Sequence, residues 1–322
     1  MVEYKDVKGA YKRVKDAVNK TPVMTSRTLN EITQAQVFLK CENFQRIGAF
    51  KMRGAYNAIS QLSNEQKKRG VITHSSGNHA QAVALAANLL NIDATIVMPK
   101  TSPQVKVNAT RDSYNATVVF CEPTIEARQK TADKLINENG YTLIHPFDND
   151  NVIAGAGTAA YELLNEIKDL EMILAPVGGG GLLSGTSIAA KGFNSKIKVY
   201  GVEPENVDDA YRSYKSGEVE TNETINSISD GLLTNLSERT LNYIRKHVDD
   251  IILVSEQEIL DSMKFLWERM KLVVEPSGAT SLAGVMFGDK NIKNKRIGVI
   301  ISGGNVDLNQ FFETYSQRLS GN

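Results

Sequence analysis

Short apolar runs alternate along this chain with longer stretches in which apolar residues recur at helical spacing. The runs lie at residues 70–74, 93–99, 117–120, 172–177, 196–202 and 296–302. Helix-periodic stretches follow four of them, at residues 79–90, 103–114, 125–139 and 182–193. Strand-like runs separated by helices are typical of βαβ units and of a mostly parallel, doubly wound sheet. Successive Val and Ile residues within the runs predict strands that are buried on both faces.

The first three strand–helix units follow one another directly and predict a small sheet of their own. We therefore expect an α/β fold in which a small domain, residues 70–142, is inserted into a large domain formed by residues 1–69 and 143–322. Residues 218–238 are polar and weakly periodic. They predict a long surface loop, and such loops often carry function.

The composition is that of an ordinary globular chain and excludes several classes of protein. The 322 residues are 41% apolar and 23% charged, with 37 Lys and Arg against 37 Asp and Glu. This balance gives no electrostatic reason to expect nucleic acid or an anionic membrane as a partner. No apolar run approaches the roughly 20 residues of a membrane helix, and the charged, helix-periodic start differs from a signal peptide. We expect a cytoplasmic protein in which Cys41 and Cys121 are buried, reduced thiols.

Four consecutive glycines separate an apolar run from a helix-periodic stretch. They are Gly178, Gly179, Gly180 and Gly181. Glycines at such a junction allow a ligand to approach the backbone closely, and the N–H groups of the helix start favour phosphate. A turn without a ligand is the alternative, although it would need only one or two glycines. A dinucleotide loop is a second alternative: a G-x-G-x-x-G spacing from Gly179 ends on Ser184, and Glu203 then lies where a ribose-binding acid is expected.

A lysine with apolar neighbours lies at Phe50-Lys51-Met52, and small residues flank it on both sides. Its stem either packs on the start of a helix while the amine reaches water, or the amine is desolvated and forms an imine with an aldehyde. This segment alone leaves both interpretations open.

Two further strand ends carry hydroxyls and glycines. Residues 75–79 (Ser-Ser-Gly-Asn-His) fit either recognition of a substrate carboxylate at a helix start or an ordinary N-cap. Residues 302–305 (Ser-Gly-Gly-Asn) fit either a hydroxyl presented to a flat ligand or a plain turn. Taken together, the four segments match the needs of pyridoxal phosphate: a lysine for the aldehyde, glycines for the phosphate and a hydroxyl for the pyridine nitrogen.

The same segments resemble those of the fold type II, or β-family, pyridoxal-phosphate enzymes, and among them the eukaryotic-type serine racemases and serine/threonine dehydratases. The resemblance covers essentially the whole chain. In residues 42–60, ENFQRIGAFKMRGAYNAIS, it implies that Lys51 carries the cofactor, while Ala49 and Ile47 stand where many members have Ser and Thr. The other implied cofactor contacts are Phe50 at the ring, Asn78 at the 3′-oxygen, Ser302 at the pyridine nitrogen, and Gly178, Gly179, Gly180, Gly181 and Leu182 at the phosphate.

The resemblance also implies a reaction. It is the conversion of L-serine to D-serine, accompanied by β-elimination of serine to pyruvate and ammonia. Lys51 is the expected base on one face of the substrate Cα. Ser76, where threonine dehydratases carry Ala, is the expected acid and base on the other face. The implied substrate contacts are Ser75, Ser76, Asn78, His79, Tyr114 and Arg128.

Further resemblances concern a metal and a nucleotide. Glu203, Val207 and Asp209 resemble the divalent-cation site of the racemases, with two carboxylates and the carbonyl of Val207 as ligands for Mg²⁺ or Ca²⁺. A solvated acidic loop is the alternative. The metal competes with the ribose interpretation of Glu203, and Asp209 favours the metal because it has no role beside a ribose. Related racemases bind ATP as an allosteric effector between the subunits of a homodimer, and the matching positions are Gln81, Lys271 and Asn305.

Three other functions remain open from the sequence. One is a dedicated dehydratase acting on L-serine, L-threonine or 3-hydroxyaspartate. The second is an NAD-binding oxidoreductase, and the third is a non-catalytic binding protein on the same fold. The first two alternatives are enzymes that act on small molecules. For the main interpretation, the substrate we expect is an amino acid.

Overall fold

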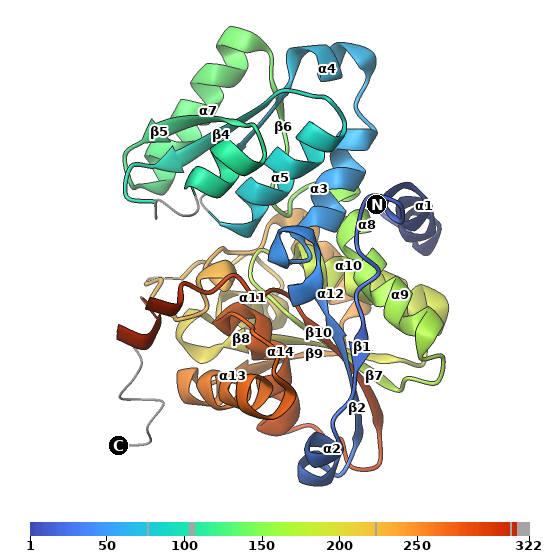
Figure 1. Cartoon of the computed structure of the whole chain (residues 1–322). Coiled ribbons are helices and arrows are strands. Elements are labelled where there is room, and N and C mark those ends of the chain that lie inside the picture. The colour runs from blue at the N-terminus through green and yellow to red at the C-terminus, as the bar shows by residue number, and fades with distance from the viewer. Residues whose placement is uncertain (76, 103–106, 223, 310, 314–322) are drawn as a thin grey trace.

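The computed structural model describes residues 1–75, 77–102, 107–222, 224–309 and 311–313, which are built around two sheets (Figure 1). The larger sheet has six strands in the order β1-β2-β10-β7-β8-β9. Their bounds are β1 Val23–Met24, β2 Gln36–Cys41, β7 Met172–Pro176, β8 Lys198–Pro204, β9 Asp250–Val254 and β10 Arg296–Ile301. The short β1 pairs antiparallel with β2, and all other neighbours are parallel. The predicted α/β fold with a mostly parallel sheet is confirmed.

Helices cover both faces of the larger sheet because its strands alternate apolar side chains between two cores. In β7, Ile173 and Ala175 join one core, whereas Met172 and Leu174 join the other. Residues of α1, α8, α9, α10 and α12 share the first core, and residues of α2, α13 and α14 share the second. The bounds are α1 Tyr4–Val14, α2 Arg27–Thr33, α8 Asp150–Ala156, α9 Thr158–Glu166, α10 Gly181–Phe193, α12 Glu238–His247, α13 Glu256–Met270 and α14 Pro276–Met286.

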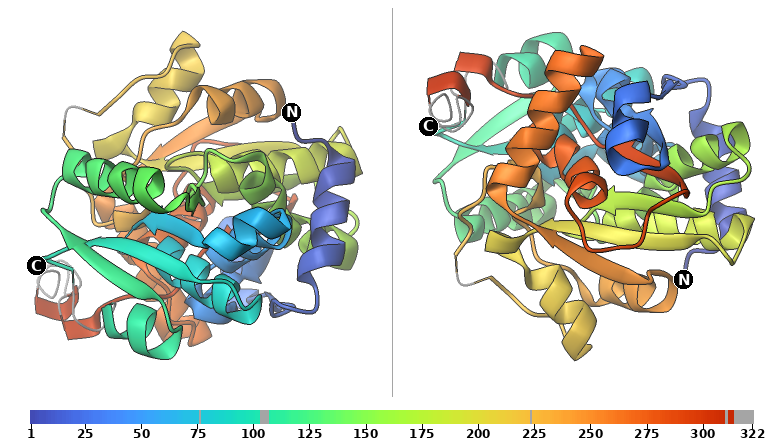
Figure 2. Two further views of the ribbon diagram at one scale, coloured as in Figure 1. Left: turned by 90° about the horizontal axis from the view of Figure 1, so that it is seen from above. Right: turned by 90° about the horizontal axis from the view of Figure 1, so that it is seen from below.

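The smaller sheet has four parallel strands in the order β5-β4-β3-β6. Their bounds are β3 Val71–His74, β4 Ala94–Pro99, β5 Thr117–Cys121 and β6 Thr142–Leu143. Helix α5 (Asn78–Leu89) packs on one face and α7 (Ile125–Asn139) on the other. The two ends of the molecule are seen in Figure 2, where the smaller sheet lies foremost in the view from above. The predicted domain boundaries at residues 70 and 142 stay a prediction.

Helix α3 (Lys51–Ser60) lies between the two sheets (Figure 1). It packs against α5 of the smaller sheet and against α8 of the larger one. The contact with α8 is close because both helices carry glycine there: a Cβ on Gly155 would lie 2.7 Å from the Cα of Gly54. Helix α4 (Asn64–Arg69) follows α3 and leads into β3. The first residue of α3 is the lysine that the sequence singled out.

Two segments, residues 103–114 and 218–238, differ in part from the sequence predictions. The predicted helix over residues 103–114 falls partly outside the described residues, and within them Ala109–Ser113 form a π-helical turn. The predicted loop over 218–238 follows α11 (Asp209–Ser216), but it is not wholly a surface segment, because Leu232 and Leu236 are buried beside the glycine loop.

Cys41 and Cys121 are free and buried, as predicted. No helix among the described residues is long and apolar enough to cross a membrane.

Candidate active site

Lys51 stands at the start of α3, with its amine turned toward the chain that follows β6. Its Nζ donates a hydrogen bond of 3.0 Å to the carbonyl of Pro146, and it lies 5.1 Å from the centre of the Phe50 ring. Burial lowers the pKa of the Lys51 amine to about 8, against an opposing pull from the Glu275 carboxylate. Such an amine is partly neutral near pH 8 and can act as a nucleophile or base. Of the two interpretations, this environment fits the desolvated amine.

The loop before Lys51 is paired with the loop that follows β10. Ala49 and Gly303 form an antiparallel bridge, and the Phe50 N–H donates a 3.0 Å hydrogen bond to the Ser302 carbonyl. The hydroxyl of Ser302, which is only 4% exposed, donates to the Ser277 carbonyl at 3.3 Å. Two segments about 250 residues apart in the sequence therefore meet at the carboxyl edge of the larger sheet, as parallel strands require.

Asn78, the first residue of α5, belongs to a hydrogen-bond network beside Lys51. Its Nδ2 donates to Oε1 of Glu275 at 2.8 Å, and its Oδ1 accepts from Nδ2 of Asn305 at 2.8 Å. The same Asn305 amide donates to the Ile47 carbonyl at 2.6 Å. The sequence predictions missed Glu275. The sequence feature that could have drawn attention to Glu275 is its place as an acidic residue between Val274 and Pro276, in an otherwise apolar stretch.

The glycine loop joins the end of β7 to α10, and each of its positions is too crowded for a larger residue. A Cβ on Gly179 would lie 2.3 Å from Cδ1 of Phe147, and one on Gly178 would lie 2.8 Å from the Cα of Leu232. Gly180 adopts a φ of +84°, in the left-handed region. No side chain among the described residues caps the start of α10, so its N–H groups point at a position suited to phosphate. This arrangement fits pyridoxal phosphate, and the next residue, Leu182, is buried.

The start of α5 is where the sequence predicts a substrate carboxylate to bind, and this stays a prediction. Ser75 Oγ accepts a 3.2 Å hydrogen bond from the Gly77 N–H, and Ser76 lies outside the described residues. The N-cap is Gly77, and none of the described side chains caps the helix. His79 is buried with Nε2 2.8 Å from the Ile144 carbonyl, and burial followed by the Lys51 charge lowers its pKa to about 3. The open helix N–H groups would suit a bound carboxylate, whereas the neutral ring of His79 adds no charge to this position.

Three basic side chains, those of His74, His145 and Arg128, lie between the start of α5 and α7. The rings of His74 and His145 lie 6.4 Å apart, and burial lowers the pKa of His145 to about 4. Burial followed by the charge of Arg128 also lowers the pKa of His74. Nε of Arg128 and Nε2 of His74 are buried without a hydrogen-bond partner in the part of the chain that the structure describes. Tyr114 instead packs against the core of the smaller sheet.

Glu203, Val207 and Asp209 lie together between β8 and the start of α11. Both oxygens of Glu203 accept hydrogen bonds, from the N–H of Ala210 at 3.0 Å and of Tyr211 at 2.8 Å. Burial and the neighbouring Asp209 raise the pKa of Glu203 well above its usual value. Burial raises the pKa of Asp209 to about 6, and its Oδ2 is buried without a partner among the described residues. An unpaired oxygen beside a second buried carboxylate fits a cation, although no group of three His, Cys, Asp or Glu gathers in the described residues.

The fully buried position of Glu203 also bears on the dinucleotide alternative. Its carboxylate caps α11 and has no exposure, so it is not presented to a ribose. The three positions matched to a nucleotide are spread over different elements. Gln81 is buried in α5, Lys271 Nζ donates to the Glu268 carbonyl at 2.6 Å, and Asn305 belongs to the Asn78 network. The contacts within the described residues do not join Gln81 to Lys271.

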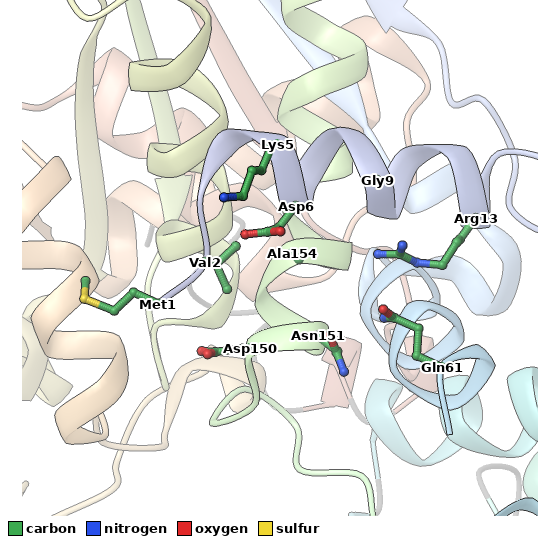
Figure 3. A pocket seen from close by; sticks show the side chains of 10 residues that line it. All are labelled: Met1, Val2, Lys5, Asp6, Gly9, Arg13, Gln61, Asp150, Asn151 and Ala154. Atoms are coloured by element: carbon green, nitrogen blue, oxygen red, sulfur yellow. The ribbon is translucent and has the colours of Figure 1, made fainter. Parts of the chain in front are cut away.

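Two surface cavities lie apart from Lys51. One, of about 220 Å³, lies between α1, the end of α3 and α8, and its lining includes Lys5, Asp6, Arg13, Gln61 and Asp150 (Figure 3). The other, of about 250 Å³, borders α5 and includes Tyr114. Neither brings a lysine amine to a glycine loop, so the chemistry is concentrated at the edge where the Lys51, Ser302 and glycine loops meet.

Comparison with known proteins agrees with this geometry. The family of pyridoxal-phosphate dependent enzymes matches residues 14–303. Serine racemase of Dictyostelium discoideum is 49% identical over 312 residues, covering 95% of this chain and 96% of that protein. L-threo-3-hydroxyaspartate ammonia-lyase of Saccharomyces cerevisiae is 48% identical over 319 residues, covering 99% and 98%. The crystal structure of the Dictyostelium discoideum serine racemase has a TM-score of 0.90 to this chain, covering 95% of this chain and 99% of that one.

Proposed function

Because the chain belongs to the family of pyridoxal-phosphate dependent enzymes, we propose that it converts L-serine to D-serine and also eliminates water from serine to give pyruvate and ammonia. The observation that carries the proposal is the buried amine of Lys51, with its pKa lowered to about 8. It is bonded to the carbonyl of Pro146, and the next residue, Phe147, packs on the crowded glycine loop. Relatives named serine racemase and ammonia-lyase support the pair of activities.

The residues proposed to hold the cofactor surround the amine. Phe50 would lie against the ring, Asn78 at the 3′-oxygen and Ser302 at the pyridine nitrogen. The N–H groups of Gly178–Gly181 and Leu182 would bind the phosphate, helped by the N-terminal dipole of α10. When bound, the cofactor withdraws electrons from the substrate Cα and makes its proton acidic.

Proton transfer at Cα is then the task of this chain. The neutral amine of Lys51 takes the proton from one face. Elimination needs this step and departure of the β-hydroxyl as water, whereas racemisation needs a second acid on the opposite face. We assign that role to Ser76 on the basis of the resemblance. Ser75, Asn78 and His79 would bind the substrate carboxylate at the start of α5.

The test is an incubation with L-serine, followed by separate measurement of D-serine and pyruvate. Wild type is expected to form both, and Lys51→Ala neither. Ser76→Ala is expected to keep pyruvate formation from L-serine and to lose D-serine formation. If Ser76→Ala still forms D-serine at the wild-type rate, the assignment of the second acid is wrong. If wild type forms only pyruvate, the protein is a dehydratase.

A second candidate substrate is L-threo-3-hydroxyaspartate. The specific observation is that Arg128 and His74 each have a buried nitrogen without a hydrogen-bond partner among the described residues, which would suit a second carboxylate. The ratio of kcat/KM for this substrate to that for L-serine measures the preference. Arg128→Gln is expected to lower the hydroxyaspartate value by about 10- to 100-fold, the loss of one charge-assisted contact, and to affect serine less. Tyr114 stays a prediction as a substrate contact.

We also propose a metal and a subunit partner. Mg²⁺ or Ca²⁺ would bind Glu203, the Val207 carbonyl and Asp209, supported by Oδ2 of Asp209, which has no partner within the part of the chain that the structure describes. A homodimer is proposed from the resemblance, and exposed apolar side chains such as Phe44, Val273 and Phe312, which are 47%, 52% and 48% exposed, are of the kind that a partner could cover. Gln81, Lys271 and Asn305 are the residues proposed for ATP at a subunit boundary. Sedimentation with and without ATP and Mg²⁺ tests both.

A further inference from the structure

Behind the lysine loop lie four charged side chains that the proposed reaction does not use. Lys40, Glu42 and Arg53 have fully buried side chains, and the side chain of Glu162 is 2% exposed. Two positive and two negative groups make the cluster formally neutral. Lys40 belongs to β2, Glu42 to the short helix after it, Arg53 to α3 and Glu162 to α9.

The guanidinium of Arg53 is held by two carboxylates at once. Nε and one terminal nitrogen of Arg53 donate to Glu42 at 2.7 and 2.9 Å. Both terminal nitrogens donate to Glu162 at 2.9 Å. Lys40 donates to Glu162 at 2.7 Å, and the Thr21 hydroxyl donates to Glu42 at 2.6 Å. Two bidentate contacts to a planar group fix its plane and direction.

Arg53 and Lys51 lie on opposite sides of α3. Residues that are two positions apart in an α-helix are separated by about 200° around the helix axis, because the helix has 3.6 residues per turn. While Lys51 faces the candidate active site, Arg53 therefore points back into the body that carries β2 and α9. A rotation of α3 that moved the Lys51 amine would have to break the two bidentate contacts.

Other contacts of α3 also restrain the helix, but they lie farther from Lys51 or act through the backbone. The close approach of Gly54 to Gly155 limits the distance to α8, and the bridge from Ala49 to Gly303 holds the start of the helix. One turn beyond Arg53, the Asn57 amide donates to the Asn151 carbonyl at 2.7 Å and accepts from Nε of Arg13 at 2.8 Å. The two bidentate contacts of Arg53 are the directional contacts of a charged side chain nearest to Lys51 along the helix.

Stability alone is a poor explanation for this cluster. Four buried charges lose their hydration, and well-packed apolar side chains of similar volume are often as stable or more so. Glu42 nevertheless stays ionised: burial would raise its pKa, but Arg53, followed by Lys40, lowers the pKa below its ordinary value. A buried ion cluster next to an active-site helix is better explained by the geometry it imposes.

We propose that Arg53, clamped by Glu42 and Glu162, is a positioning residue that sets the rotation of α3 and so directs the Lys51 amine toward the glycine loop and the substrate. This inference rests on the proposed function, because it takes Lys51 as the reacting amine. Lys40 completes the charge balance of Glu162 and so keeps the clamp neutral.

Two variants separate positioning from folding. Arg53→Lys keeps the charge and loses the planar geometry. A neutral variant replaces all four charges with groups of similar volume, by Lys40→Met, Glu42→Gln, Arg53→Met and Glu162→Met together, and should retain the fold. Leu260→Ala is the matched control, because it weakens the core on the far side of the larger sheet without touching α3. Each holoenzyme is measured per bound cofactor, and its unfolding by urea is recorded.

We expect both Arg53 variants to lose about 10- to 100-fold in kcat, the effect of a displaced reacting group. Their KM for serine should change by less than about threefold. The acidic limb of their pH profile should move to higher pH, because a Lys51 amine that is turned out of its buried position is more hydrated. Borohydride reduction should also fix less cofactor on Lys51. The Leu260→Ala control should unfold at lower urea with a wild-type kcat and pH profile.

The outcomes decide between the interpretations. The proposal is overturned if either Arg53→Lys or the neutral variant folds and keeps the wild-type kcat and the wild-type acidic limb of the pH profile. Failure of both to fold also overturns it, because the cluster would then be an element of stability. If only the neutral variant fails to fold, Arg53→Lys decides by the same criteria. Failure of the proposed function is recognised separately, since wild type itself would then carry no cofactor on Lys51.

Discussion

Glu275 accepts a 2.8 Å hydrogen bond from Nδ2 of Asn78, although 197 positions separate the two residues. The carboxylate is thereby held at the start of α14, close enough to Lys51 to raise the pKa of its amine. Burial acts in the opposite direction and is the stronger influence. The reactivity of Lys51 is therefore set by a balance between desolvation and one fixed negative charge.

Replacing Glu275 by Gln should shift this balance. Glutamine can still accept from Asn78 but carries no charge, so the pKa of Lys51 should fall below its value of about 8. Activity requires the neutral amine, which is present above this pKa and lost as the pH falls through it. The acidic limb of kcat/KM for serine should therefore move to lower pH. An unchanged limb, or one that moves to higher pH, would show that Glu275 does not act on Lys51.

The contact between Gly179 and Phe147 predicts a paired mutational effect. Gly179→Ala places a Cβ 2.3 Å from the Phe147 ring, which should lower the free energy of unfolding by about 1–3 kcal/mol and weaken cofactor binding. Adding Phe147→Leu removes the ring and should recover part of both losses. Urea unfolding and cofactor titration measure them. Equal losses in the single and double variants would mean that the ring is not what excludes a side chain.

Histidines in the site predict a loss of stability in acid. His79 and His145 have pKa values lowered to about 3 and about 4, chiefly by burial. Each stays neutral in the folded chain but takes a proton in the unfolded chain below about pH 6.5. The free energy of unfolding should fall between pH 6.5 and 4 by up to about 1.4 kcal/mol per pH unit for each histidine.

His79→Gln is the variant for this prediction, because its amide can still donate to the Ile144 carbonyl but does not titrate. It should show a shallower pH dependence than wild type over the same interval. His247 lies in α12, away from these residues, and His247→Gln is the control that should leave most of the slope in place. If His79→Gln and wild type show the same slope, burial of His79 is not its source.

Asp209 predicts how the protein responds to divalent cations. A metal at 100 times its dissociation constant stabilises a protein by about 2.7 kcal/mol, so Mg²⁺ or Ca²⁺ should raise the melting temperature of wild type and a chelator should reverse the rise. Asp209→Asn should melt near metal-free wild type and respond to neither. A full response in Asp209→Asn would place the cation elsewhere. Asp169→Asn, at an exposed carboxylate, is the control.

Much of the site follows from sequence because its loops occupy strand ends. The glycines after β7 and Ser302 after β10 share the carboxyl edge of one sheet, and that edge is determined once the strands are predicted to be parallel. Lys51 does not follow a strand directly, and its approach to Ser302 depends on the bridge between Ala49 and Gly303. The local pattern singled out this lysine but left its role open, and the combination of the four segments and the family resemblance assigned it to the cofactor.

The remaining features depend on contacts that no local pattern encodes. Glu275 and Asn78 are joined across the two sheets, and the partners of Arg53 come from residues 11 and 109 positions away. A charged residue such as Glu42 or Glu162 in a mixed sequence is predicted on the surface, because charges are rarely buried unless they are paired. Ile47, at a φ of 60°, is likewise unexpected, since a β-branched residue seldom adopts the left-handed region.

The most direct test of the account is the site of covalent attachment. Borohydride reduction of the purified holoenzyme fixes pyridoxal phosphate to the amine that carries it, and peptide mapping then identifies that amine. We predict that the reduced cofactor is found on Lys51, and that Lys51→Ala yields no labelled peptide. A label on another lysine, or none in wild type, would contradict the account.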